Sequence, residues 1–184
     1  MKIFTLKANE NWICDRFAEE WIKYNGAFNE PDPNKADVIW LLSSWQWKSI
    51  PLNLLTNKKI IATIHHIVPE KFKQQQYRDF RELEKFVDLY HVPSKKSFDQ
   101  VKLLTKKPIK QIPFWVNQHL WHSLEKEKIR EKYDFKKDSY LIGSFQRDTE
   151  GADLMSPKLE KGPDLFCDYI IEESKKRDNL EVIL

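Results

Sequence analysis

The sequence predicts an α/β protein with a Rossmann-like, doubly wound parallel sheet and helices on both of its faces. Short strand-like runs alternate with helix-like segments along the 184 residues of the chain. The apolar runs, such as VIWLL at residues 38–42, are not interrupted by polar residues, which is typical of strands covered on both faces. Polar residues follow directly after these runs, as expected for a ligand site at the carboxyl edge of a parallel sheet.

The first three strands are expected at apolar runs, which occupy residues 2–6, 37–43 and 59–64. Between the first two, the sequence predicts a helix at 12–24, because the apolar residues from Ile13 to Tyr24 recur at helical spacing. A glycine and two prolines follow and end this helix in a loop. The opening of the chain therefore predicts one strand–helix–strand unit, followed by a further strand.

The middle of the chain continues the alternation. Pro69 opens a long polar helix with Phe80 and Leu83 on its buried stripe. Ser94 is expected to cap the next helix, which runs through Leu104. Strands are expected on either side of this helix, at 87–92 and 109–114.

The composition changes between residues 114 and 140, where Lys and Glu dominate and a charged helix is expected at 124–133. A strand, a helix and a strand follow, at 140–145, 163–176 and 180–184. We expect an N-terminal Rossmann-like domain, a linker helix region and the start of a C-terminal domain, at residues 1–120, 121–138 and 139–184. A single strand–helix–strand unit is too small to cover both faces of a sheet. We therefore expect an incomplete second domain and a longer parent protein.

Charge and cysteine content limit the possible partners and location. The net charge of +3 is too small to demand nucleic acid, but it is compatible with an anionic substrate or a membrane surface. Cys14 and Cys167 lie within helix-like patterns, which indicates buried thiols in a reducing cytosol rather than a disulfide. No signal peptide or membrane-length apolar run is present. We expect a cytoplasmic protein. If it contacts a membrane, we expect peripheral association at the inner face.

The first candidate site lies at the end of the third predicted strand, where His65 and His66 follow the apolar run. A strand tip can direct an imidazole into a cleft, where the neutral ring forms hydrogen bonds and the charged ring stabilises negative charge. The alternative is a histidine packed at the sheet edge, and position alone leaves both open. Asn11 and Trp12 follow the first strand and are expected at the same edge.

The second candidate site is the loop that joins the strand at 140–145 to the following helix. Arg147, Lys158 and Lys161 flank this loop, and Gly162 precedes the proline that begins the helix. A helix N-terminus presents unpaired N–H groups and a partial positive charge. Together with a guanidinium and an ammonium, it would form a cradle for a diphosphate. The alternative is three solvated surface cations.

The remaining histidines are expected to be structural. His119 and His122 form an H-x-x-H pair, but further metal ligands at suitable spacing are missing, so we expect no metal site. His91 lies inside a predicted strand.

Four segments, in this order, carry a resemblance to a known family. They are ATIHH at 62–66, VPSKKS at 92–97, IKQIPFWVNQHLW at 109–121, and IGSFQR at 142–147 followed by EKGPDL at 160–165. They resemble the T-x-H-D strand tip, the V-x-S-x-x-x step, the I-P-x-G-V-D-x-x-x-F turn and the V-G-R…K-G-x-D-L donor segment of retaining GT-B glycosyltransferases (glycosyl transferases group 1, family 4-like). The E-x7-E motif of that family would lie beyond Leu184.

The resemblance implies transfer of a sugar from a nucleotide-sugar donor, bound between the two domains, to a glycan or a lipid-linked acceptor. Arg147 and Lys161 would hold the diphosphate leaving group, and His65 would lie near the transferring sugar as the catalytic residue. Transfer would proceed with retention, without a metal ion or a cofactor. The further donor-binding residues expected are Ser144, Lys158 and Gly162. The acceptor-binding residues expected are Asn11, Trp12 and His66.

Two other functions remain as alternatives. The chain could be a non-catalytic module that binds a glycan or a partner, with Asn11, Trp12, Trp45 and Trp47 as a sugar-stacking surface unless these tryptophans are buried. A dinucleotide-dependent Rossmann enzyme is disfavoured, because no G-x-G-x-x-G follows the first strand.

Overall fold

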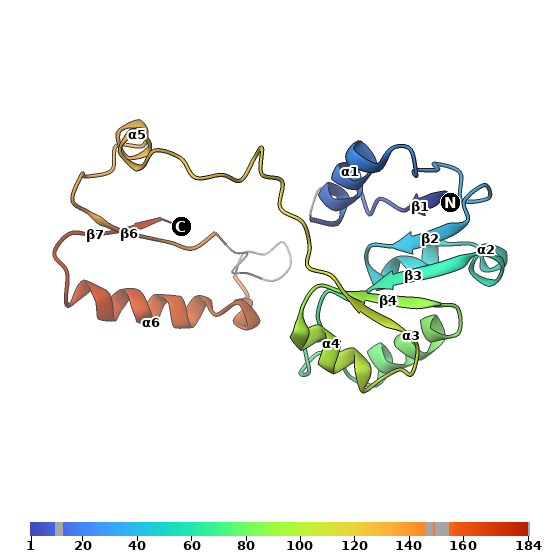
Figure 1. The fold of residues 1–184 in the computed structure, drawn as a ribbon. Helices are drawn as coiled ribbons and strands as arrows, with labels where there is room; N and C mark the ends of the chain where they lie inside the picture. The colour runs from blue at the N-terminus through green and yellow to red at the C-terminus, as the bar shows by residue number, and fades with distance from the viewer. Residues whose placement is uncertain (10–12, 146–148, 150–154, 184) are drawn as a thin grey trace. The chain divides into compact units, whose positions relative to one another are not determined.

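The structure is a computed structural model that describes residues 1–9, 13–145, 149 and 155–183. The chain divides into two compact units, Met1–Trp121 and His122–Leu184, each of which is described by itself (Figure 1). In the described part of the chain, no helix is both long enough and apolar enough to cross a membrane.

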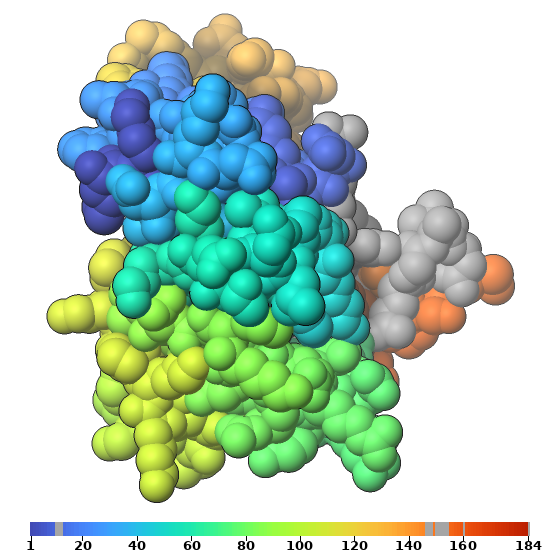
Figure 2. Space-filling view, turned by 90° about the vertical axis from the view of Figure 1, so that its right-hand side faces the viewer, coloured from blue at the N-terminus to red at the C-terminus, as the bar shows by residue number. Residues whose placement is uncertain are grey.

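A five-stranded parallel sheet forms the centre of the first unit. Its strands follow chain order and are β1 (Ile3–Thr5), β2 (Val38–Leu41), β3 (Lys59–Thr63), β4 (Leu89–Val92) and β5 (Ile109–Gln111). In Figure 2, the surface colour of this unit passes from blue through cyan to green and yellow, so segments that are successive in the chain lie side by side. All five strands predicted from apolar runs in this unit are confirmed; four of them end earlier than predicted, whereas β4 ends at Val92 as predicted. The polar residues after each run therefore lie in loops at the carboxyl edge of the sheet.

The sheet reverses its winding direction at β1. Residues 28–30 form a parallel bridge to Ile3, whose N–H donates to the carbonyl of Phe28 at 2.8 Å and whose carbonyl accepts from Glu30 at 3.0 Å. This bridge lies on the edge of β1 that faces away from β2. Helix α1 (Ile13–Asn25) therefore crosses the sheet in the opposite direction to the later helices. Because parallel crossovers are right-handed, α1 lies on the opposite face.

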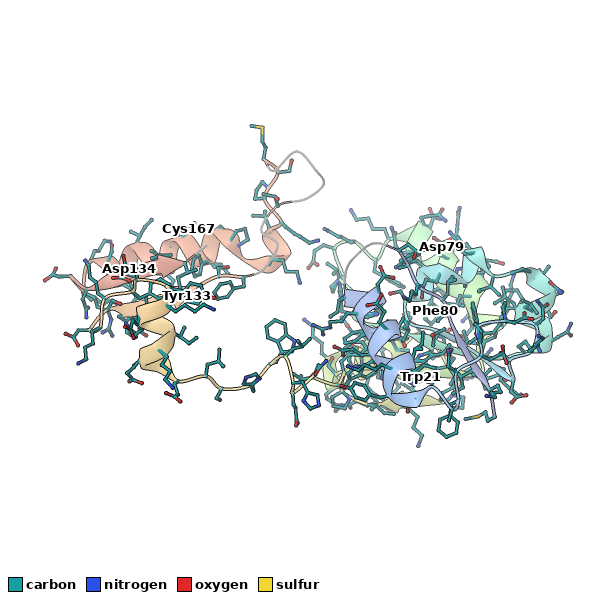
Figure 3. The ribbon with its side chains drawn as sticks, turned by 90° about the horizontal axis from the view of Figure 1, so that it is seen from above. Trp21, Asp79, Phe80, Tyr133, Asp134 and Cys167 are labelled. Carbon is teal, nitrogen blue, oxygen red and sulfur yellow. The ribbon has the colours of Figure 1, made fainter. Side chains whose placement is uncertain are left out.

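Two separate cores confirm the predicted helices on both faces. On one face, Phe17 and Ala18 of α1 pack with Leu42, Trp40 and aromatic residues that follow β5. On the other face, Ile39 and Leu41 contact the helices α2 (Leu52–Asn57), α3 (Gln74–Glu84) and α4 (Lys95–Lys102) through the core members Leu54, Leu55, Phe80, Leu83 and Val101. Consecutive residues of β2 thus point to opposite faces. In Figure 3, Trp21 of α1 and Asp79 of α3 lie on opposite sides of this unit.

Three local features of the first unit differ from the sequence prediction or extend it. Helix α3 begins at Gln74 rather than at Pro69, because residues 69–71 form a turn in which the carbonyl of Val68 accepts from Lys71 and Phe72. The segment between β2 and β3 contains the 3-10 helix η1 (Ser44–Ser49) and the short helix α2, neither of which was predicted. Both are too short to show a hydrophobic period. The predicted cap is confirmed, since the Ser94 hydroxyl accepts from the N–H of Ser97 at 3.1 Å.

The second unit contains helix α5 (Lys126–Lys132), strand β6 (Tyr140–Gly143), the 3-10 helix η2 (Leu159–Lys161), helix α6 (Pro163–Ser174) and strand β7 (Leu180–Ile183). Strands β6 and β7 are parallel, with Tyr140 opposite Leu180. Helix α5, in the predicted linker region, belongs to this unit. Among its described residues, only Ser139 and Glu173 are buried, and apolar side chains such as Leu165 and Ile171 on α6 are exposed.

Candidate functional site

The ring of His65 is held at the carboxyl edge of the first sheet, just after β3. Its Nε2 lies 2.6 Å from the carbonyl oxygen of Leu42, just after β2. A carbonyl can only accept, so Nε2 carries the hydrogen and donates it. The ring packs against Phe114, with centroids 4.9 Å apart, and the carbonyl of His65 accepts from the Ser97 hydroxyl at 2.8 Å. The segments after β2 and β5 thus orient the ring, and α4 holds the backbone of the same residue.

The environment keeps His65 uncharged near neutral pH. Burial is the largest cause that lowers the pKa of His65 below its ordinary value of 6.5, and the hydrogen bond to Leu42 opposes this shift. The neutral ring with its hydrogen on Nε2 has one lone pair, on Nδ1. His65 can therefore accept a hydrogen bond from a hydroxyl, whereas stabilisation of a negative charge by an imidazolium is disfavoured.

Two further side chains that the sequence analysis did not identify lie beside this ring. The thiol of Cys14, in the first turn of α1, lies 3.0 Å from the hydroxyl of Ser43 and 3.9 Å from Nε2 of His65. Ser43 itself lies 3.3 Å from the same nitrogen. The available signal was their position, since each follows a parallel strand in the chain, as His65 does. The three side chains meet where the winding direction of the sheet reverses, the place where doubly wound sheets bind ligands.

The expected acceptor residues are only partly described. Asn11 and Trp12 lie outside the described residues. His66 lines a pocket of about 240 Å³ together with residues of η1 and α3, whereas His65 is not part of that lining. The two neighbouring histidines therefore belong to different surroundings at the same edge of the sheet.

In the second unit, a tight turn brings together most of the expected donor-binding residues that are described. In η2, the carbonyl of Lys158 accepts from Lys161 at 2.8 Å, and that of Leu159 accepts from Gly162 at 2.9 Å. Gly162 has φ 69° and ψ 41°, the left-handed conformation that glycine adopts without strain. Pro163 follows as the first residue of α6, as predicted. Arg147 lies outside the described residues.

The N-terminus of α6 has the character of an anion site. Its N-cap residue, Gly162, has no side chain that could cap it. The exposed side chain of Lys161 and the half-buried side chain of Lys158 bring positive charge to the same turn, and the acidic Asp164 lies in the first turn of the helix. Ser144 follows β6 at the carboxyl edge of this sheet, and its N–H donates to Ile183 at 3.0 Å. The first-turn amides and the nearby ammonium groups can together bind a phosphate.

The other histidines have separate environments. Nε2 of His91 lies 2.8 Å from the carbonyl of Ile112, and its Nδ1 lies 3.0 Å from the hydroxyl of Thr63. His119 lines a pocket in the first unit, and His122 lines one in the second. Over residues 1–9, 13–145, 149 and 155–183, no group of three potential metal-ligating side chains comes together.

Comparison with known proteins extends the description of the fold. No protein-family profile matches the chain, and no curated protein does. The structure is similar to the crystal structure of Anabaena Alr3699/HepE in complex with UDP and glucose, with a TM-score of 0.68 and 12% sequence identity. The likeness covers 98% of this chain, which spans 60% of the length of that protein. At this identity the likeness supports the fold, and it agrees with the Rossmann-like α/β architecture predicted from the sequence.

Proposed function

We propose that the chain belongs to a nucleotide-sugar glycosyltransferase of the GT-B type. In this proposal, the turn before α6 binds the diphosphate of the donor in the second unit. The carboxyl edge of the first sheet, around His65 and His66, binds a glycan or a lipid-linked acceptor. Retention at the anomeric carbon, independence of metal ions, the domain roles and the cytoplasmic or membrane-peripheral location remain predictions.

The observation that supports this proposal most is the similarity of almost the whole chain to a protein whose crystal structure contains UDP and glucose. The geometry of the turn at Lys158, Lys161 and Gly162 adds chemical support. Both lysines lie in the turn that precedes α6, a helix longer than three turns whose N-cap residue provides no side-chain cap. A diphosphate carries the charge that such a place stabilises.

In the proposed reaction, the bond between the anomeric carbon and the diphosphate oxygen breaks, and the electron pair leaves with the diphosphate. The acceptor hydroxyl forms the new bond to this carbon and gives its proton to the departing phosphate. Lys161 and Arg147 would stabilise the charge that grows on the leaving group. Loss of one well-placed donor of this kind typically raises the barrier by about 3 kcal/mol. The ring of His65 is neutral and has its lone pair on Nδ1, so it would accept a hydrogen bond there from a hydroxyl of the sugar or the acceptor.

Titration calorimetry with UDP tests the donor site. We expect Lys161→Ala to raise the dissociation constant for UDP about tenfold or more, because a hydrogen bond to a charged group is worth about 1.5–3 kcal/mol. The matched control is Lys175→Ala, which removes a lysine from the other end of α6, where it pairs with Glu172 at 2.7 Å. This variant should bind UDP as the unaltered chain does. An equal loss in both variants, or no UDP binding by the unaltered chain, would contradict the proposal.

A non-catalytic binding module remains the second candidate, favoured by the 50% exposure of the Trp45 side chain. Such a module would bind a glycan and show no affinity for UDP in the same calorimetric experiment.

A further inference from the structure

The pocket that His66 lines has a mostly apolar interior. Its walls come from η1, from the chain that leaves β3 and from the first three turns of α3. The apolar side chains that define it include Trp45, Trp47, Ile67, Phe72 and Phe80. It encloses about 240 Å³ at the carboxyl edge of the first sheet. Figure 3 shows Asp79 and Phe80 on α3, the helix that forms one wall.

A buried polar anchor sets the geometry of the pocket wall. Gln46 in η1 is fully buried (0% exposed), its Nε2 donates to the carbonyl of Leu6 at 2.8 Å, and its Oε1 accepts from the N–H of Ser43 at 2.9 Å. Trp45 and Trp47, on either side of Gln46 in the chain, both line the pocket. Trp47 packs towards the core, with its ring 6.1 Å from that of Phe86, whereas Trp45 remains half exposed. The pocket therefore has an aromatic wall formed by one packed and one half-exposed tryptophan.

The charged groups of the pocket neutralise one another. Nζ of Lys48 lies 2.9 Å from the carboxylate of Asp79, which also accepts from Gln75 at 3.3 Å. The hydrogen bond from Lys48 lowers the pKa of Asp79 below its ordinary value, so the carboxylate is ionised at neutral pH. A ligand with its own charge would have to compete with this pair and lose hydration in an apolar interior. The chemistry of the pocket therefore favours an uncharged, apolar group.

We propose that this pocket binds the apolar part of the acceptor, such as an alkyl or aromatic group attached to the sugar that receives the transferred residue. The role as an acceptor site rests on the proposed function, whereas the affinity for an apolar group rests on the pocket alone. The lining residues Ser44 and His66 follow Ser43 and His65 in the chain, so the pocket and the side chains around His65 lie at the same carboxyl edge of the sheet. This assignment differs from a sugar-stacking surface, because the walls are apolar on several sides.

A series of alkyl β-D-glucosides tests the inference, because the sugar is constant and only the chain from methyl to octyl changes. Each methylene that enters the pocket should strengthen binding by up to about fourfold. We expect affinity, measured by titration calorimetry below the micelle concentration, to rise along the series and then reach a plateau when the pocket is filled. Equal affinity for methyl and octyl glucoside would overturn the proposal.

Two variants locate the effect. Trp45→Ala removes one wall and should weaken octyl glucoside binding about fivefold or more, with an unchanged far-UV circular dichroism spectrum. Tyr77→Ala removes an aromatic residue of similar exposure (48%) from α3 that does not line the pocket, and it should bind as the unaltered chain does. If Trp45→Ala binds the octyl compound normally, the pocket is not the site.

Parallel titrations with UDP separate this inference from the proposed function. Trp45→Ala should bind UDP normally, because Lys161 and its turn belong to the other unit. If no variant binds UDP but the chain-length dependence persists, the proposed function fails and the apolar site stands. If UDP binds and the chain-length dependence is absent, the donor site stands and this inference fails.

Discussion

At the scale of single residues, two histidines at the sheet edge share one arrangement. His65 and His91 each donate from Nε2 to a backbone carbonyl, that of Leu42 and that of Ile112. The other nitrogen of His91 is bonded to Thr63. The Thr63 hydroxyl accepts from the indole of Trp40 at 3.0 Å and can donate to Nδ1 of His91. His91 thus has both nitrogens occupied by the protein. Of these two rings, that of His65 has no described hydrogen bond at Nδ1, where a ligand hydroxyl could donate.

The same arrangement predicts a pH dependence of stability. Burial is the main cause that lowers the pKa of both His65 and His91 in the folded chain. The unfolded chain then binds more protons below the ordinary value of 6.5, so stability is present above that pH and is lost as pH falls through the lower folded value. We expect the free energy of unfolding, from urea titration followed by tryptophan fluorescence, to be smaller at about pH 5.5 than at about pH 7.5.

A pair of substitutions tests the contribution of one ring. His91→Gln should reduce the difference in unfolding free energy between the two pH values, because one of the two titrating groups is gone. His119→Gln, which removes an exposed histidine, should leave this difference as in the unaltered chain. Identical pH dependence in both variants would show that the ring of His91 does not contribute.

At the scale of elements, what could be predicted depended on length and on local chemistry. The strands and α1 could be predicted because each contains a continuous or repeated apolar pattern. The cap of α4 could be predicted because the Ser94 hydroxyl bonds to Ser97, only three residues further along the chain. Helix α2 and η1 lack such a pattern. The position of η1 depends instead on Gln46, whose partner Leu6 is distant in sequence. The pocket wall that this residue sets could not be predicted for the same reason.

The turn before α6 yields a prediction at this scale. Gly162 adopts φ 69°, where any residue with a Cβ is strained by about 1–2 kcal/mol. We expect Gly162→Ala to weaken the amide hydrogen-exchange protection of α6 by that amount, and Gly162→Asn to weaken it less. Gly26→Ala serves as the control, because its backbone is not left-handed and an added Cβ would lie 3.4 Å from the carbonyl of Ile22. Equal protection of α6 in Gly162→Ala would contradict a required left-handed turn.

At the scale of the whole molecule, the two units differ in how much apolar surface they bury. The first unit contains two hydrophobic cores on opposite faces of its sheet. In the described part of the second unit, Ser139 and Glu173 are the buried residues. The sequence predicted this contrast from the single strand–helix–strand pattern after residue 139. It also located the strand-tip histidines. The pairing of Lys48 with Asp79 could not be predicted, because it depends on how η1 and α3 meet in the fold.

This contrast predicts unequal stability within one chain. Local opening costs less free energy where few apolar contacts are lost. We expect the amides of β6 and β7 to exchange with a lower opening free energy than those of β3 and β4, as measured by native-state hydrogen exchange in the full chain. Tryptophan fluorescence will follow the first unit, since all described tryptophans lie in it.

The expected difference in opening free energy between the two units allows a test of the proposed donor site. A ligand that binds only the folded state stabilises it by about 2.7 kcal/mol at about 100 times its dissociation constant. UDP bound at the turn before α6 should therefore increase protection in α6, β6 and β7, while β3 and β4 change little. The increase should be lost in Lys161→Ala and retained in Lys175→Ala. Protection that appears in β3 and β4 alone would move the nucleotide site to the first unit, because the stabilised element is the one whose opening releases the ligand.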